Sequence, residues 1–192
     1  MARRTDTRRR MLESAAELFH TQGYHATGLN QVVTTSGAPK GSLYFHFPGG
    51  KEQLAAEALR MSGSHLCEVL REVIAEAPDP ARAVRAIVDL LIGALTGSGF
   101  QRGCPLAAVT LDAAADSEQI RAACAEGYDS WRELLAEFFA EQGLAAERAA
   151  ALATVVLASI EGGLLLAKAS HDPAPLHAVA DHLYATIEKE LS

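Results

Sequence analysis

The chain has few cysteines. Its 192 residues include only Cys67, Cys104 and Cys124, an odd number that lie far apart in the sequence. No two of them have the spacing of a paired metal-binding motif. The sequence therefore predicts a protein of a reducing cytoplasm, with no metal site and no cofactor.

A long uninterrupted apolar run is also missing. The longest run, 149–167, is broken by Glu161 and contains Thr154 and Ser159. A membrane-spanning helix needs about 20 residues with few or no charges. We therefore expect a buried helix here and no membrane partner. The basic N-terminus is not followed by an apolar stretch, which argues against a signal peptide.

Neither a catalytic motif nor a phosphate-binding loop is present, so we do not expect an enzyme. An all-helical enzyme that pairs Cys104 with His65 is the alternative from another class, although nothing in the sequence brings these two residues together. Strand-like alternation and internal repeats are absent as well. These absences predict an all-α fold.

Charge is distributed unevenly along the chain. The net charge is −7, which by itself disfavours a nucleic-acid partner. Residues 1–51, however, contain seven Lys or Arg and three acids, a net charge of +4, so the remainder carries −11. A basic segment on an acidic body suggests a polyanionic partner at one end of the protein.

Apolar residues recur at helical spacing almost throughout, and Gly and Pro punctuate about nine helices. We expect the first helix between Asp6 and Gly23. Thr27 is expected to cap a short second helix that Gly37 ends, and Pro39 opens a short third. These three form a predicted helix-turn-helix DNA-binding domain over residues 1–50, and a helical body follows over 51–192. The body helices are expected near 50–76, 84–95, 105–115, 117–142, 145–170 and 173–191.

The third helix has the chemistry to read DNA, because it can hold phosphates and offer a face to base edges. Lys40 places a charge at the start of the helix, and Gly41 removes side-chain bulk where close approach is needed. Ser42, Tyr44 and His46 carry hydrogen-bonding groups. Exposed polar residues on a packed helical hairpin are the alternative interpretation.

The segment from Gly37 to Phe47 reads G-A-P-K-G-S-L-Y-F-H-F and precedes K-E-Q-L at 51–54. It resembles the TetR family of bacterial repressors, whose head ends in G-x-x-x-G-[ST]-L-Y-x-[HY]-F before a lysine-led fourth helix. The resemblance covers about residues 8–60. It implies a homodimer on a pseudo-palindromic double-stranded DNA operator, in the bacterial cytoplasm and on the nucleoid when bound. The DNA-contacting residues that it implies are Thr27, Ala38, Pro39, Lys40, Gly41, Ser42, Tyr44, His46 and Lys51.

The second helix departs from the family pattern. Asn30, Gln31, Thr34 and Thr35 are uncharged, where relatives often carry charged residues. Among these four, we expect Gln31 to contact DNA.

A second resemblance concerns the body. Residues 100–106 read F-Q-R-G-C-P-L, similar to the G-C-P-L of the LmrA/YxaF-type subgroup, whose members respond to flavonoids and drug-like compounds. This implies an apolar or aromatic effector, and a ligand pocket needs apolar surface with a few polar groups. Plain core packing is the alternative for each residue taken singly. The pocket residues that we expect are Met61, His65, Leu91, Leu95, Phe100, Cys104, Leu106, Val109, Thr110, Tyr128 and Trp131.

The last two helices are expected to form the dimer interface as a four-helix bundle. The residues assigned to it are Val156, Ile160, Gly163, Leu176, Val179, Leu183 and Ile187. The alternative is that both apolar faces are buried within one chain. Glu161 fits a place in the pocket, at the interface or in solvent.

The expected mechanism begins with two recognition helices held about 34–36 Å apart, one turn of DNA. An effector that enters between the fourth and seventh helices tilts the fourth helix and changes this separation, which lowers DNA affinity. A redox-sensing thiol at Cys104, near a helix N-terminus where a thiol pKa can fall, is an alternative role for that residue. A helical DNA-binding protein without an effector is the alternative for the whole chain.

Overall fold

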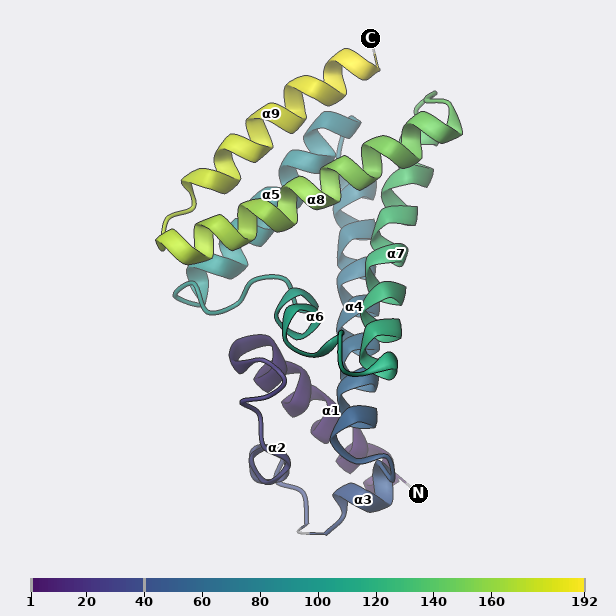
Figure 1. Ribbon diagram of the computed structural model, residues 1–192. Coiled ribbons are helices and arrows are strands. Elements are labelled where there is room, and N and C mark those ends of the chain that lie inside the picture. Colours follow the sequence, from purple (N-terminus) through teal and green to yellow (C-terminus); the bar gives the residue numbers. More distant parts are fainter. Residues whose placement is uncertain (1, 40, 192) are drawn as a thin grey trace. The chain divides into compact units, whose positions relative to one another are not determined.

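The computed structural model describes residues 2–39 and 41–191, with side chains from Asp6 onward. This described part is all helical and contains no strand (Figure 1), which confirms the predicted fold class. Its helices are α1 (Ala2–Gln22), α2 (Leu29–Thr35), α3 (Leu43–His46), α4 (Gly50–Glu76), α5 (Pro80–Gly97), α6 (Ala107–Ala113), α7 (Glu118–Glu141), α8 (Ala146–Ser170) and α9 (Ala174–Glu190).

The chain divides into two compact units. Unit 1 holds residues 1–64 and 104–127, and unit 2 holds residues 65–103 and 128–192. Helices α4 and α7 therefore contribute a segment to each unit. The sequence instead predicts a domain boundary at residue 50, where the three-helix head ends. That boundary stays a prediction.

In unit 1, α1, α2 and α3 pack around a shared apolar centre. Met11 and Phe19 of α1 meet there with Val32 of α2, and all three side chains are buried. Leu43 and Phe47 are also buried, because residues four apart lie on one face of a helix. The opposite sides of α2 and α3 are left facing outward.

The turns of the head depend on glycine. Gly23 follows α1 with a φ of +81°, and Gly37 follows α2 with a φ of +62°, a region that other residues rarely adopt. Helix α2 begins later than predicted, because its N-cap is Gly28 rather than Thr27. The Thr27 hydroxyl donates to the Gly23 carbonyl at 2.8 Å instead.

Still within unit 1, α4, α6 and α7 approach one another closely. A Cβ atom on Gly63 of α4 would lie 3.3 Å from the Cα of Gly127 in α7. A Cβ atom on Gly127 would lie 2.5 Å from Cδ1 of Leu106, the N-cap of α6. Two glycines thus bring three helices together at a distance that larger residues would not allow.

In unit 2, α9 packs against both α5 and α8. Gly163 of α8 makes this possible, because a Cβ atom there would lie 3.0 Å from Cδ2 of Leu176 in α9. Arg85 of α5 donates to Asp181 of α9 at 2.6 Å. Its guanidinium also lies 5.1 Å from the centre of the Tyr184 ring. Both packing and a charged contact therefore hold α9 in place.

Helix α8 is long and apolar enough to cross a membrane, judged by length and composition alone. In the structure, however, one side of it is buried in unit 2, through Ala149, Leu152, Ala153, Val156, Ile160, Gly163, Leu164 and Ala167. The core helix of a compact unit meets the same length and composition test.

Candidate nucleic-acid interface

The recognition segment, residues 41–47, buries one apolar side and exposes a side that carries aromatic and polar residues. Tyr44 and Phe45 are 63% and 62% exposed, whereas Leu43 is 3% exposed. Large aromatic side chains are seldom left this open without a use. The exposed side of α3 is therefore the natural surface for a partner.

Helix α3 is shorter than the sequence suggests. The Ser42 amide donates to the Pro39 carbonyl at 3.1 Å and the Ser42 hydroxyl donates to the same oxygen at 2.7 Å, so a turn precedes the helix. Gly41 has a φ of +87°, and no atom lies within 4 Å of the point where a Cβ would stand. The backbone of this turn is therefore open to close approach by a partner molecule.

Two hollows flank α3. The α2–α3 hollow has a volume of about 470 Å³ and is lined by Leu29, Asn30, Val33, Thr34, Gly41, Leu43 and Tyr44. The α1–α3 hollow has a volume of about 840 Å³ and is lined by Asp6, Thr7, Arg10, Gly37, Pro39, Ser42, Phe45 and His46. The recognition helix is thus a ridge with a concave surface on each side.

The predicted DNA-contacting residues differ in how open they are. Gln31 is exposed, and its amide donates to the Gln22 side chain at 3.3 Å. Ala38 and His46 are half-buried, and Pro39 and Gly41 are exposed. Lys40 lies outside the described residues.

Thr27 does not present its hydroxyl to the surface. It is 1% exposed and its hydroxyl is bonded to the Gly23 carbonyl. The expectation that its side chain contacts a phosphate therefore needs correction, because the residue instead fixes the loop before α2. Local sequence does not indicate this role, since a Thr at that place is also a good N-cap.

Lys51 is half-buried at the start of α4. Its ammonium lies 4.4 Å from the centre of the Tyr24 ring, a cation–π contact. Burial lowers the pKa of Lys51, and the nearby Asp112 carboxylate opposes that shift. Burial, followed by Glu52, raises the pKa of Tyr24.

The α1–α2 loop is tied to α6. The His25 amide donates to the Asp112 carboxylate at 2.8 Å, and the His25 Nε2 lies 3.0 Å from the Asp112 carbonyl. A second long-range hydrogen bond runs from the Ser117 hydroxyl to Glu52 of α4. The link between His25 and Asp112 was not predictable from local sequence, because these residues lie 87 positions apart.

The predicted effector residues fall on both units. Met61, Cys104, Leu106, Val109 and Thr110 belong to unit 1, and His65, Leu91, Leu95, Phe100, Tyr128 and Trp131 belong to unit 2. Within unit 2, the rings of Tyr128 and Trp131 meet edge to face with centres 5.4 Å apart. Trp131 is buried whereas His65 is exposed. The pocket as a whole stays a prediction.

All three cysteines are buried thiols that form no disulfide. Cys104 is 5% exposed, and its sulfur accepts the Leu106 amide at 3.4 Å. Burial raises the pKa of the Cys124 thiol, and a hydrogen bond with Thr110 opposes the shift. Among the described residues, no three His, Cys, Asp or Glu side chains form a group that could hold a metal ion.

The residues expected at the dimer interface lie inside the chain's own core. Val156, Ile160, Leu176, Leu183 and Ile187 are at most 4% exposed. Gly163 is also buried, and Val179 is half-buried beside it. These side chains are not available to a second subunit, because α8 and α9 use them to pack within unit 2. The residue assignment therefore needs correction, and the two helices stay candidates through their other faces.

A short helix pair with a buried apolar side, an exposed aromatic and polar side and a glycine turn defines a helix-turn-helix DNA-binding protein. Comparison with known proteins agrees. Residues 11–58 match the family model of bacterial regulatory proteins of the tetR family, and residues 80–182 match that of the LmrA/YxaF-like transcriptional regulator C-terminal domain.

Relatives and solved structures are similar over nearly the whole chain. An uncharacterised HTH-type transcriptional regulator of Bacillus subtilis, YxaF, is 36% identical over 99% of this chain and 100% of its own length. The HTH-type transcriptional regulator LmrA of the same species is 39% identical over 89% and 91%. The crystal structure of a TetR-family regulator from Cytophaga hutchinsonii superposes with a TM-score of 0.85 at 23% identity, over 99% of this chain and 97% of that one. The chain belongs to the TetR family of DNA-binding transcriptional regulators, and within it to the LmrA/YxaF-like group.

Proposed function

We propose that this regulator is a homodimeric repressor that leaves its DNA operator when a small apolar or aromatic effector binds in the helical body. It would act in the bacterial cytoplasm, on the nucleoid when bound to DNA. The observation that carries the proposal is the exposed recognition segment, in which Tyr44 stands outward over a buried Leu43. No catalytic role is proposed.

The DNA contacts follow from exposure. In our proposal, α3 enters the major groove, where Gly41 allows close approach and Tyr44 and His46 face bases or the backbone. Gln31 of α2 is exposed for the same surface. Ala38, Pro39, Lys40, Ser42 and Lys51 complete the proposed set. Thr27 acts through the loop that it holds rather than by direct contact.

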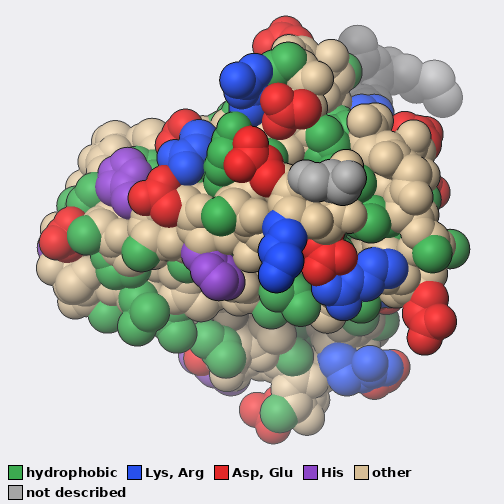
Figure 2. Space-filling view, turned by 90° about the horizontal axis from the view of Figure 1, so that it is seen from above, with side chains coloured by type: hydrophobic (Ala, Val, Ile, Leu, Met, Phe, Trp, Pro, Cys, Tyr) green, Lys and Arg blue, Asp and Glu red, His purple; other side chains and the backbone are tan. Residues whose placement is uncertain are grey.

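Dimerisation is proposed through the outer face of α8. Figure 2 shows hydrophobic side chains gathered along the lower left edge of its view. On α8, Leu165 and Leu166 are both 60% exposed and Val155 is 54% exposed. These residues belong to an exposed apolar stripe at helical spacing, made of Ala151, Val155, Ala158, Gly162, Leu165, Leu166 and Ala169.

Within this stripe, Gly162 offers room for a partner, since no atom lies within 4 Å of the position of its missing Cβ. A self-complementary helix face of this kind suits the two-fold symmetric contact of a homodimer. Two subunits would supply the two recognition helices that a pseudo-palindromic operator needs.

The effector signal is proposed to reach the head through α6 as well as α4. Val109 and Thr110 lie on α6 among the predicted pocket residues, and Asp112 on the same helix accepts the His25 amide at 2.8 Å. A ligand that displaces α6 would therefore pull on the loop before α2. A coupling of about 1–3 kcal/mol corresponds to about a 5- to 150-fold change in DNA affinity.

The test begins with a fluorescent DNA duplex from the gene's own upstream region, titrated with protein at two salt concentrations. We expect saturable binding that salt weakens, and loss of binding in Tyr44→Ala and Lys40→Ala at an unchanged melting temperature. The matched control is Glu118→Gln, an exposed α7 residue that should bind as the native chain does.

Effectors would then be screened by the fluorescence of Trp131, the only tryptophan in the chain. Apolar aromatic compounds that change this fluorescence should also release the labelled duplex. Compounds that bind without releasing DNA would argue against effector control. If the protein bound neither the upstream duplex nor random genomic fragments, the repressor proposal itself would be refuted.

A further inference from the structure

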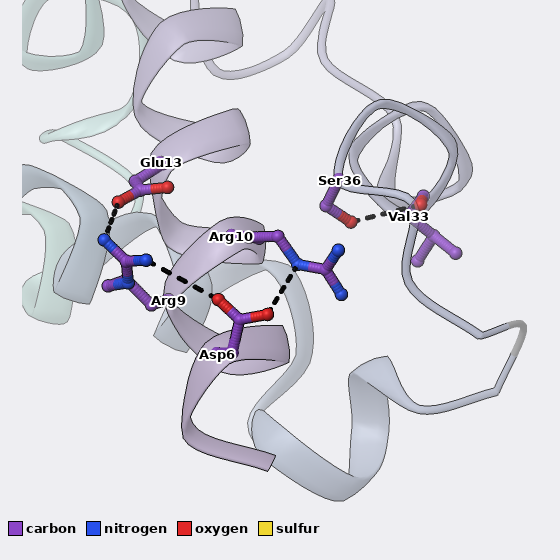
Figure 3. Close-up of polar contacts among 6 residues, drawn as sticks. All are labelled: Asp6, Arg9, Arg10, Glu13, Val33 and Ser36. Atoms are coloured by element: carbon purple, nitrogen blue, oxygen red, sulfur yellow. Dashed lines mark hydrogen bonds and ion pairs between the residues drawn. The ribbon is translucent and has the colours of Figure 1, made fainter. Parts of the chain in front are cut away.

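Arg10 of α1 holds its guanidinium in an unusual setting. Its Nε is buried and has no hydrogen-bond partner among the described residues. The nearest acid oxygen, Oδ2 of Asp6, lies 3.6 Å away, which is too far for a hydrogen bond. Figure 3 shows the two terminal nitrogens of Arg10 pointing away from Asp6, toward the part of the head that holds Ser36.

The two preceding arginines are differently placed. Arg8 donates to Glu57 of α4, and its guanidinium lies 5.1 Å from the centre of the Phe47 ring. Arg9 donates to Glu13 at 3.2 Å and forms an ion pair with Asp6 at 3.5 Å, both within α1. Within this arginine run, Arg10 is therefore the residue that makes an ion pair but no hydrogen bond to an acid among the described residues.

Arg10 also lines the α1–α3 hollow, together with Thr7 of α1 and Ser42 and His46 of the recognition segment. This hollow joins a cation and hydroxyl groups to a part of the proposed DNA surface. A guanidinium is a donor that proteins use for phosphate oxygens, whereas the Ser42 hydroxyl already donates to the Pro39 carbonyl. The chemistry of the hollow fits a phosphodiester.

The position of the hollow identifies the source of the phosphate. Ser42 and His46 face it from one side of α3, while Gly41 and Tyr44 line the α2–α3 hollow. A helix in the major groove, which is about 12 Å wide, has a sugar-phosphate strand on each side. A concave surface beside α3 that carries an arginine therefore meets one of these strands.

We propose that the α1–α3 hollow binds one phosphate of the DNA backbone, with Arg10 as its cation. The proposal rests on DNA binding by α3 and extends the contact surface to α1. Binding exchanges the 3.6 Å ion pair between Arg10 and Asp6 for direct hydrogen bonds from the guanidinium to phosphate oxygens. The Asp6 carboxylate also lines the hollow and repels the incoming phosphate, which lowers the affinity of the site for it.

The test uses two matched pairs of variants in the full chain. Arg10→Gln and Arg9→Gln remove the same charge from adjacent residues, and only the former lines the hollow. Asp6→Asn and Glu13→Gln remove an acid from each side of Arg9, and only Asp6 lines the hollow. Affinity for the upstream duplex and for a scrambled duplex is measured by anisotropy across a chloride series, and melting temperatures report folding.

We expect Arg10→Gln to weaken binding about tenfold per engaged subunit, the effect of one charge-assisted hydrogen bond. The slope of log K against log salt should fall by about 0.9 per engaged subunit. The loss should be alike on both duplexes, because a phosphate contact carries no sequence information. Asp6→Asn should tighten binding, and Arg9→Gln and Glu13→Gln should change it much less.

Equal affinity and equal salt slope for Arg10→Gln and Arg9→Gln, in a chain that binds the upstream duplex, would overturn this phosphate site and leave DNA binding intact. If Arg10→Gln melts early, Asp6→Asn decides, since unchanged or weaker binding by that variant would also overturn the site. Absence of binding by the native chain would overturn both proposals.

Discussion

Replacement of Gly127 by Ala tests the close packing of α6 against α7. The added Cβ would lie 2.5 Å from Cδ1 of Leu106 and 3.7 Å from its Cδ2 and Cγ. Leu106 is fully buried, so its side chain has little room to move aside. The substitution therefore forces either a strained Leu106 rotamer or a displacement of α6.

Two opposing effects set the magnitude. Overpacking of this kind costs about 1–3 kcal/mol, whereas Gly to Ala inside a helix favours the helix by about 0.8–1.0 kcal/mol. The net loss for Gly127→Ala is then about 0–2 kcal/mol. Gly93→Ala in α5 is the matched control, because no atom lies within 4 Å of its Cβ position. This variant should gain the helix preference of Ala over Gly without a packing penalty, and so stabilise the chain.

Thermal unfolding of the two variants at one protein concentration provides the assay, because the proposed dimerisation would make melting temperatures depend on concentration. The expected difference of about 1–3 kcal/mol corresponds to about 2–12 °C at this chain length. Gly127→Ala should melt below the native chain or close to it, and Gly93→Ala above it. If Gly127→Ala melted as high as Gly93→Ala, the close contact with Leu106 would be incorrect.

Three further outcomes follow from the contacts. Asp112→Ala should lower the melting temperature by about 1–6 °C, the effect of one lost hydrogen bond. The same variant should release less DNA when the effector is added. Asp116→Ala, which changes an exposed neighbour, should do neither. Leu165→Glu should shift the protein from dimer to monomer in sedimentation without unfolding it, and a persistent dimer would exclude the α8 stripe. Arg148 donates to Glu190 at 2.8 Å and lowers the pKa of that carboxyl. The stabilisation is therefore present above the ordinary Glu pKa and is lost as pH falls through the lowered value. Acid unfolding curves of Arg148→Gln should show a shallower decline there than those of the native chain.

The sequence predicted those features that depend on local rules. Helical spacing predicted the fold class, and the glycines after α1 and α2 were expected where their positive φ values now occur. The four-residue spacing of Leu43 and Phe47 accounts for the buried side of the segment that holds α3. Each of these depends on residues within a few positions of one another, where backbone sterics and helical periodicity decide the outcome.

Features that depend on distant contacts were not predictable in the same way. The hydrogen bond from His25 to Asp112 joins segments 87 residues apart, and an aspartate on a short helix carries no local sign of such a role. The burial of the Arg10 Nε likewise depends on how α1 packs. In the sequence, Arg10 is one of three consecutive arginines, and only the packing distinguishes it from Arg9.

The dimer assignment failed for a related reason, and α8 shows why. This helix has apolar residues on two faces, with Val156 and Ile160 on one and Val155 and Leu165 on the other. Periodicity identifies an apolar face but not what covers it, so the more regular face was assigned to a partner although the chain itself covers it. The two faces therefore make different predictions. A polar residue at Val156 should unfold unit 2 at every protein concentration, whereas a polar residue at Leu165 should leave a folded monomer whose DNA affinity falls because only one half-site is held.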